Sequence, residues 1–404
     1  MLSPTVPWPL DLGGKIRIWH TFKQLSAEHQ VSIACAAQEP AASEGVDYLT
    51  ELAEAVHVTR VPPQPRWRAS WRTIASADPY RVVKFHREDL KRWLLNHLAA
   101  ESYDLIWVQF LNMLTHLSDD VLSRNVIVLD QHNADERVWA SYAHEGSIVN
   151  RAFAQQNLWK LRRFQRRMLD YVDVVLSVSD DEAAFMRSRV PTSCEVWTMP
   201  NGVDVDGFHP GPAHADVLRE PVILFCGSMD VTMNVDAAVR FANRIFPTVQ
   251  AHHPEAMFWI VGRRPTRAVQ ELDEREGIQV TGDVADVRPY YERATVLVVP
   301  FRYGAGTKLK VLEAMAMGVP VVATPVGCQG IDVEPGRHLY VEESDEPFAE
   351  RVTELVQDPD ARARLARAGR ELVEARYSWR QIVRETAQHL EHLVEERRQH
   401  VGSE

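Results

Sequence analysis

Short apolar runs alternate with longer helical patterns along the whole of this 404-residue chain. Strands buried on both faces read as continuous apolar runs, and parallel strands need a long crossover, usually a helix, to connect them. This alternation therefore predicts an α/β fold with parallel sheets covered by helices. The predicted strands span residues 31–35, 105–108, 126–129, 174–178, 222–226, 257–261, 296–299 and 320–323. Two of the predicted helices span residues 234–246 and 360–375.

The strand patterns fall into two sets, which meet at the turn-forming cluster Met-Pro-Asn-Gly-Val-Asp at residues 199–204. This length is enough for two to three domains with large cores. Residues 62–80 are rich in proline, tryptophan and arginine, and we expect them to form a long irregular excursion on the surface of the first domain. Ligands of parallel sheets bind beyond the carboxyl ends of the strands.

Composition narrows the classes of protein. Hydrophobic content of 45% and charged content of 25% are ordinary for a soluble globular chain, and a net charge of −11 argues against a nucleic-acid partner. Four scattered cysteines have no paired spacing, so neither a disulfide framework nor a zinc site is expected. No apolar run approaches the roughly 20 residues that span a bilayer, and the N-terminus has no signal pattern. These features predict a cytoplasmic protein, and peripheral attachment to the inner membrane face stays open.

The stretch from Tyr303 to Thr324 joins a glycine loop to a helix that carries one carboxylate. Gly304 and Gly306 stand where an apolar strand ends and the helix begins. A helix start offers unpaired N–H groups and about half a positive charge, and glycines let an anion approach the backbone closely. Glu313 follows two to three turns later, where it can accept hydrogen bonds from hydroxyls of the same ligand. A phosphate-binding loop followed by a hydroxyl-binding carboxylate indicates a sugar nucleotide.

This stretch resembles the donor-binding loop of the family 4 glycosyltransferases, which have the GT-B fold. The run Glu313-Ala-Met-Ala-Met-Gly-Val-Pro-Val-Val matches the second half of the family pattern, whereas Ala305 stands where the pattern has an earlier Glu. The form Gly-x-Gly-Thr-Lys-x-Lys resembles a branch of the family in which that Glu is replaced. The resemblance implies two Rossmann-like lobes that face a cleft, with a C-terminal helix after Trp379 that crosses back to the first lobe.

The domains implied are an acceptor-side lobe, residues 1–198 completed by 378–404, and a donor-binding lobe, residues 199–377. In the second lobe Ser228 and Asn234 stand where many family members have an Arg and a Lys, so two cations are missing from a site for a diphosphate. We predict Lys308 as the replacement, with a catalytic role, and Arg302 as the second candidate; a surface location of both stays open. The donor-binding residues predicted for this lobe are Gly227, Ser228, Asn234, Gly262, Arg263, Val284, Arg302, Gly304, Ala305, Gly306, Thr307, Leu309 and Glu313.

The first lobe contributes two further predictions. Gly13 and Gly14 precede an amphipathic pattern and are expected to begin a helix. The resemblance implies that this loop approaches the donor phosphates and the acceptor. His132 directly follows a buried strand, and the resemblance implies a catalytic His here that hydrogen-bonds the donor sugar. The alternative is an ordinary loop histidine.

Residues 159–168 form a strongly basic helical pattern. Three interpretations stay open: a solvated face, a patch for an anionic or lipid-phosphate acceptor, or docking on an anionic membrane surface.

The predicted function is transfer of a hexose from a nucleoside-diphosphate sugar to an acceptor hydroxyl in the biosynthesis of a glycan or a glycosylated natural product. The resemblance implies retention of anomeric configuration. No metal and no cofactor beyond the sugar-nucleotide co-substrate are expected, because helix N-termini and cations would neutralise the diphosphate. The acceptor is expected to be a glycan, a lipid-linked sugar or a small molecule. The alternatives are a sugar-nucleotide epimerase of the same architecture and a non-catalytic sugar-nucleotide-binding subunit of a polysaccharide assembly complex.

Overall fold

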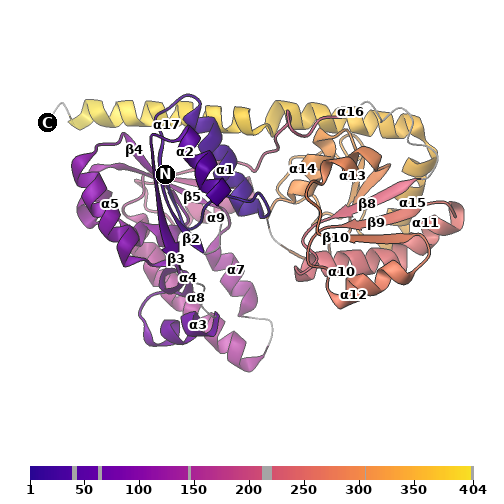
Figure 1. Cartoon of the computed structure of the whole chain (residues 1–404), viewed down its shortest axis with the longest axis horizontal. Helices are drawn as coiled ribbons and strands as arrows, with labels where there is room; N and C mark the ends of the chain where they lie inside the picture. The colour runs from indigo at the N-terminus through magenta and orange to yellow at the C-terminus, as the bar shows by residue number, and fades with distance from the viewer. Residues whose placement is uncertain (39–42, 62–65, 144–146, 212–220, 305, 402–404) are drawn as a thin grey trace. The chain divides into compact units, whose positions relative to one another are not determined.

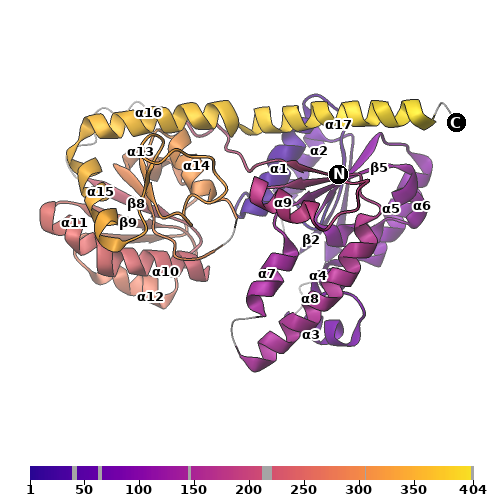
Figure 2. The ribbon, with the colours of Figure 1, turned by 180° about the vertical axis from the view of Figure 1, so that it is seen from behind.

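The structure is a computed structural model that describes residues 1–38, 43–61, 66–143, 147–211, 221–304 and 306–401. The chain divides into two compact units (Figures 1 and 2). The first unit comprises Met1–Pro200 and Val383–Glu404, and the second comprises Asn201–Ile382. Both are α/β units built on a parallel sheet, as the sequence predicts.

Within the described residues, the sheet of the first unit has seven strands in the order β3-β2-β1-β4-β5-β6-β7. All neighbouring strands are parallel. The short strand β1 is central, since Leu2 pairs with Ala34 on one side and with Val108 on the other. The strands are β1 (Leu2–Ser3), β2 (Ser32–Gln38), β3 (Ala55–Val61), β4 (Leu105–Gln109), β5 (Val126–Gln131), β6 (Val174–Ser177) and β7 (Glu195–Thr198).

Helices connect these strands. They are α1 (Gly13–Ser26), α2 (Ser43–Leu52), α3 (Arg66–Ala75), α4 (Tyr80–Phe85), α5 (Glu88–Ala100), the 3-10 helix η1 (Leu111–His116), α6 (Asp119–Arg124), α7 (Asp135–Tyr142), α8 (Ile148–Leu169) and α9 (Asp180–Arg187). The terminal helix α17 (Trp379–Val401) belongs to the first unit from Val383 onward, where Arg397 donates to Asp173 at 2.5 Å. A terminal helix that returns to the first lobe was implied by the family resemblance, and it is present.

The expectation of an irregular excursion at residues 62–80 is wrong for most of that stretch, because residues 66–75 form α3. Ala69 and Thr73 lie one turn apart and are buried. On α8, the Lys160 ammonium donates to the Thr73 carbonyl at 2.5 Å. Packing on α8 therefore stabilises a helix that the composition of the segment did not indicate.

The second unit has a six-stranded parallel sheet in the order β10-β9-β8-β11-β12-β13, counted over the residues that the structure describes. The strands are β8 (Val222–Cys226), β9 (Met257–Val261), β10 (Ile278–Gly282), β11 (Val296–Val299), β12 (Val321–Ala323) and β13 (Tyr340–Val341). Three predicted strands, residues 222–226, 257–261 and 296–299, match residue for residue. Every side chain of β8 and β11 is buried, which explains their continuous apolar sequence.

Helices lie on both faces of this sheet, with α10 and α12 on one side and α13, α14 and α16 on the other (Figure 1). The predicted helix at 234–246 is interrupted by a π-helical turn, Phe241–Ile245, just before Pro247. Proline lacks an N–H donor and clashes with the preceding turn, which accounts for the interruption. The helices are α10 (Thr232–Arg240), α11 (Phe246–His252), α12 (Arg267–Gln270), α13 (Arg288–Arg293), α14 (Leu309–Ala316), α15 (Asp345–Gln357) and α16 (Pro359–Arg376).

Candidate functional site

In the second unit, the carboxyl ends of β8 and β9 bring two glycines into direct contact. The Gly227 amide donates to the Val261 carbonyl at 2.9 Å. A Cβ atom added to Gly262 would collide with the carbonyl oxygen of Gly227. Only glycine fits at 262, and the two loops therefore form one continuous backbone surface at this end of the sheet.

Lys310 reaches this glycine surface from the first turn of α14. Its ammonium lies 3.1 Å from the Asn234 side-chain oxygen, and a Cβ atom on Gly227 would lie 2.9 Å from it. The rings of Phe225 and Phe301 face the same ammonium, with centroids at 4.4 and 4.8 Å. Burial lowers the pKa of Lys310 to about 8. The Lys310 ammonium therefore lies beside Asn234, where the family resemblance implied that a positive charge is missing. Lys310 was not among the predicted site residues.

Lys308, the predicted cation, lies just before α14 and is also buried. Its ammonium donates to the Gly306 carbonyl at 2.6 Å and lies 5.7 Å from the centroid of Phe301. Burial lowers its pKa to about 8. Two ammonium groups therefore flank the glycine loop, and both lose part of their hydration there.

The glycine loop itself carries an unsatisfied hydroxyl. Gly304 and Gly306 have φ angles of 124° and 78°, which suit glycine alone at low cost. Between the loop and α14, the Thr307 hydroxyl is buried and has no hydrogen-bond partner among the residues described here. Leu309 begins α14, whereas Ala305 lies outside the described residues. A buried hydroxyl and two lysines at one loop match the needs of a multiply charged oxyanion.

Glu313 lies one turn beyond Lys310 on α14. Its carboxylate accepts a hydrogen bond from the Tyr291 hydroxyl at 2.9 Å. Burial raises the pKa of Glu313, while the bond from Tyr291 and the charge of Lys310 lower it. Tyr291, on α13, is fully buried and was not predicted. This bond fixes the carboxylate and leaves its other oxygen available to a ligand hydroxyl.

The remaining predicted residues of the second unit lie in two different settings. Arg263 donates to the Ser228 hydroxyl at 3.2 Å, and the Asn234 amide donates to the Ser228 carbonyl at 2.9 Å, so these three residues form one cluster beside Gly227. Val284 packs on the core of the unit. Arg302 instead pairs with Asp236, with Nε 3.1 Å from the carboxylate, and its side chain is 55% exposed. The charge of Arg302 is thus already balanced.

The first unit forms a second polar cluster beyond the carboxyl ends of β4 and β5. The predicted helix start is confirmed, because α1 begins at Gly13. A Cβ atom on Gly14 would lie 3.3 Å from Nδ1 of His132, which is tighter than ordinary contact. His132 itself is buried. Gly14 and His132 are thus neighbours, although they lie far apart in the sequence.

A chain of buried groups holds the His132 ring. The Gln109 amide, oriented to satisfy its neighbours, donates to Nε2 of His132 at 2.6 Å and to Asp130 at 3.3 Å, and it accepts from Trp107 at 3.3 Å. Asp130 in turn forms a fully buried ion pair with Arg17 at 2.8 Å. Arg17 also donates to the carbonyls of residues 199 and 200, at 2.9 and 3.2 Å.

This arrangement defines the tautomer of His132. Because Nε2 accepts from Gln109, the proton of the neutral ring lies on Nδ1, which is buried and without a hydrogen-bond partner in the described part of the chain. Burial lowers the pKa of His132 to about 3, and Arg17 and Arg81 also lower it, whereas Asp130 raises it. His132 is therefore a neutral hydrogen-bond donor at physiological pH.

Phe110 forms one wall beside His132. Its ring centroid lies 4.1 Å from that of His132, and the Arg81 guanidinium lies 5.1 Å from the Phe110 centroid. Phe110 has a φ of +69°, an unusual conformation for a bulky residue that costs of order 1–3 kcal/mol. Arg81 also pairs with the buried Asp135 at 3.3 Å. Strain of this kind persists where the surrounding structure imposes it, as it often does at binding sites.

No group of three or more His, Cys, Asp or Glu residues in the described part of the chain is arranged to hold a metal ion. No helix in that part of the chain is long and apolar enough to cross a membrane.

Two α/β units, each built on a parallel sheet with glycines and a polar cluster at its strand ends, have the GT-B fold, and solved structures share this fold. Sucrose-phosphate synthase from Thermosynechococcus elongatus aligns with a TM-score of 0.70 and 21% identity over 97% of this chain and 98% of that chain. Anabaena HepE in complex with UDP and glucose aligns with a TM-score of 0.63 and 15% identity over 94% and 96% of the two chains.

Family models match both units. Residues 13–206 match the Glycosyltransferase Family 4 model, and residues 220–358 match the Glycosyl transferases group 1 model. The chain belongs to the family 4 glycosyltransferases, which confirms the resemblance.

Two relatives are similar in sequence. An uncharacterized 44.6 kDa protein in the cps region of Klebsiella pneumoniae is 22% identical over 87% of this chain and 89% of its own length. A GDP-mannose-dependent monoacylated alpha-(1-6)-phosphatidylinositol monomannoside mannosyltransferase from Corynebacterium glutamicum is 30% identical over 54% of this chain and 62% of its own length.

Proposed function

We propose that this glycosyltransferase transfers a hexose from a nucleoside-diphosphate sugar to an acceptor hydroxyl, with retention of configuration. The observation that carries the proposal is the loop before α14. Two ammonium groups that lose hydration by burial, Lys308 and Lys310, and the unsatisfied Thr307 hydroxyl lie there, one to two turns from Glu313. An unsatisfied buried hydroxyl is costly, and a diphosphate would accept a hydrogen bond from it and balance the charge of both lysines.

In this proposal the second unit binds the donor. Lys308 and Lys310 stabilise the negative charge that develops on the leaving diphosphate, which is the step where preorganised cations contribute most. Glu313, fixed by Tyr291, accepts from the ribose hydroxyls. These residues would neutralise the diphosphate without a metal ion or any cofactor beyond the sugar nucleotide.

The first unit contributes the Nδ1–H group of His132, which donates to a sugar hydroxyl as the glycosidic bond forms. Gly13 and Gly14 keep the backbone beside this donor accessible, since a side chain at position 14 would crowd the ring. Because His132 stays neutral, we assign it a positioning and polarising role and not that of a general acid with an ordinary histidine pKa.

The relatives support candidates for donor and pathway. HepE was solved with UDP and glucose, and the Corynebacterium relative depends on GDP-mannose. UDP-sugars and GDP-sugars are therefore the two donor candidates. The Klebsiella relative is encoded in a cps region, which supports glycan or polysaccharide biosynthesis as the setting. The acceptor is proposed to be a glycan, a lipid-linked sugar or a small molecule.

The test is calorimetric titration with UDP, UDP-glucose, GDP and GDP-mannose, followed by detection of free nucleoside diphosphate with and without a panel of acceptors. Binding of one nucleotide series and acceptor-dependent release of its diphosphate are expected. Conversion of the donor sugar without any acceptor would indicate an epimerase instead. Donor binding without turnover for every acceptor would indicate a binding subunit.

A further inference from the structure

Three helices of the first unit, α3, α7 and α8, project away from its sheet (Figures 1 and 2). We refer to residues 66–75, 135–142 and 148–169 as the helical projection. An aromatic cluster stiffens its base, since Trp139 contacts Phe153 at 6.1 Å and Tyr80 at 5.8 Å between ring centroids. Lys160 ties α3 to α8 through the Thr73 carbonyl. The projection is therefore a packed element that can present a defined surface.

The projection concentrates exposed apolar side chains. Six of the eleven large apolar side chains that are exposed in the described part of the chain belong to it. Ile148 and Val149, at the start of α8, are 83% and 76% exposed, and Trp71 and Trp159 are 67% and 62% exposed. The other two are Ile74 and Tyr142. Six such side chains on three adjoining helices indicate an interaction surface, whereas single exposed residues do not.

Two of these helices, α3 and α8, carry one sign of charge. Helix α3 contains three arginines, α8 contains five arginines and one lysine, and neither contains an aspartate or a glutamate. The chain as a whole has a net charge of −11, so the basic residues here are strongly segregated. On α8, Arg151, Arg163 and Arg166 are exposed and form no ion pair with any described residue. Arg151 lies three residues after Ile148, and Arg163 and Arg166 lie four and seven residues after Trp159, so these side chains share one face of α8.

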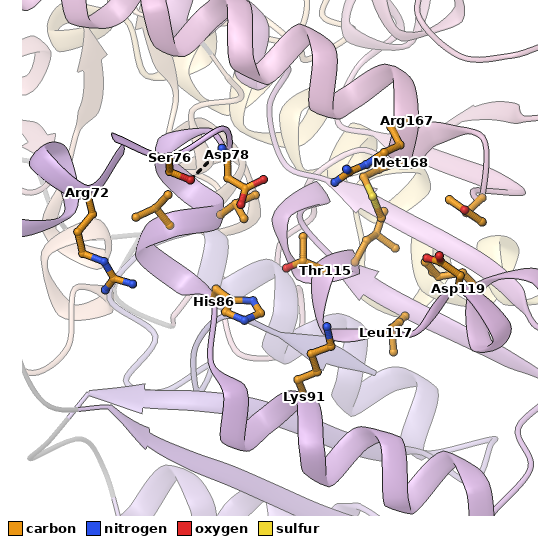
Figure 3. A pocket seen from close by; sticks show the side chains of 15 residues that line it. Arg72, Ser76, Asp78, His86, Lys91, Thr115, Leu117, Asp119, Arg167 and Met168 are labelled. Carbon is orange, nitrogen blue, oxygen red and sulfur yellow. Dashed lines mark hydrogen bonds between the residues drawn. The ribbon is translucent and has the colours of Figure 1, made fainter. Parts of the chain in front are cut away.

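A pocket of about 490 Å³ is lined by residues of α3 and α8 together with residues of neighbouring elements of the first unit (Figure 3). Arg72 from α3, Arg167 from α8 and Lys91 from α5 line this pocket, together with apolar residues that include Leu114 and Met168. None of the three cations has an ion-pair partner among the described residues, although Asp78 and Asp119 also line the pocket. Three cations and several apolar side chains in one pocket suit a phosphate group that is attached to an apolar chain.

We propose that the helical projection docks this protein on an anionic lipid bilayer. Tryptophan favours the membrane–water interface, and arginines on the same face contact anionic headgroups. Apolar residues alone would fit a protein partner, and arginines alone would fit a soluble polyanion; the two along one helical face match a bilayer surface. The chemistry of transfer in the proposed function does not depend on this docking, which adds a location for the reaction.

The test is sedimentation of the whole protein with vesicles of phosphatidylcholine alone or of phosphatidylcholine with phosphatidylglycerol. We expect binding that requires the anionic lipid and weakens as salt is added. Each arginine at an anionic surface contributes about 1 kcal/mol, which is about fivefold in affinity, so Arg163→Gln with Arg166→Gln should weaken binding roughly 25-fold. Trp159→Ser should weaken it at least about fivefold, because Trp anchors the interface.

The matched controls lie on α5 of the same unit, where Arg92→Gln and Leu95→Ser replace an exposed cation and an exposed leucine. Both should leave vesicle binding unchanged. Equal binding to neutral and anionic vesicles, or equal loss in the controls, would overturn the proposal. Loss of vesicle binding in the presence of free glycerol 1-phosphate would indicate a site for soluble phosphate esters and would overturn it as well. Nucleotide binding measured by calorimetry on the same samples tests the proposed function separately.

Discussion

Lys310→Met should stabilise the free protein and weaken its binding of nucleoside diphosphate. Methionine keeps the length and the apolar stem of the side chain but removes the ammonium that lies between Phe225, Phe301 and Asn234. In the free protein that ammonium is held in a poorly hydrated site. The diphosphate is the partner that the site lacks until the donor binds.

The pKa of Lys310 gives the magnitude of the stabilisation that we expect from Lys310→Met. Burial lowers it from 10.5 to about 8, and one pKa unit corresponds to about 1.36 kcal/mol, so the charged form costs about 3 kcal/mol in the folded protein. The contacts with the two rings offset part of this cost, which leaves about 1–3 kcal/mol to be gained by methionine. Below pH 8 the ammonium is charged in both the folded and the unfolded protein, and the folded protein bears the full cost of burying the charge. Between pH 8 and 10.5 the unfolded chain binds the proton and the folded protein does not, so this contribution to stability rises with pH.

The assays are thermal unfolding across pH 7–10 and calorimetric titration with nucleoside diphosphate at pH 7. For a domain of this size each kcal/mol shifts Tm by about 2–4 °C, so Lys310→Met should unfold several degrees higher at pH 7. Its affinity for the diphosphate should fall by about 1.5–3 kcal/mol, the range for hydrogen bonds to charged groups. Lys23→Met, at an exposed position of α1, is the control and should change neither quantity. A folded Lys310→Met protein that binds the diphosphate like the wild type would refute the assignment.

Three further predictions concern the residues around this cation. Glu313→Gln keeps the shape but weakens a charge-assisted bond, so donor affinity should fall by roughly 1.5–3 kcal/mol; unchanged affinity in calorimetry would exclude the ribose contact. Lys308→Ala should weaken binding of the donor and of the free diphosphate together while sparing the nucleoside, and Ser228→Arg should partly restore it. His132→Ala should lower the single-turnover rate at saturating donor at least about tenfold, equivalent to about 1.4 kcal/mol, with little change in donor affinity. Because burial lowers the pKa of His132 to about 3, the rate of the wild-type enzyme should show no pH dependence near the ordinary histidine pKa. If the His132→Ala variant turns over as fast as the wild type, His132 is a structural residue.

The sequence predicted the interior strands of each sheet, except the two-residue strand β1, and missed the edge strands. Strands β8, β9 and β11 are buried on both faces or nearly so, and their unbroken apolar runs located them residue for residue. Apart from the two-residue strand β1, the strands absent from the prediction are β3, β7, β10 and β13, which are the edge strands of the two sheets. Polar residues break their sequences, as in Glu195-Val-Trp-Thr198, because one side of an edge strand meets solvent. An unbroken apolar run therefore identifies a strand that is buried on both faces, and it misses strands that are half exposed.

For the candidate site, the sequence indicated single residues next to predicted elements but not their distant partners. Gly14 and His132 could be proposed from their places after predicted elements, and the structure brings them together. Gln109 and Arg17, which set the tautomer and environment of His132, could not be proposed because their partners lie 23 and 113 residues away in the sequence. Lys310 had a visible signal, the second lysine of Gly-x-Gly-Thr-Lys-x-Lys, but choosing between the two lysines required knowing which one faces Asn234.

The departures from the family pattern are consistent with one physical requirement. A diphosphate site needs positive charge near its glycine loops, and here Ser228 and Asn234 supply none. Lys310 reaches the same point from α14, and Asn234 accepts a hydrogen bond from it where a second cation would repel it. Asn234 and Lys310 are thus coupled: a lysine at 234 placed against Lys310 would lower the pKa of both and weaken the site. The positive charge at this point thus comes from Lys310 on α14, and Asn234 on α10 accepts a hydrogen bond from it.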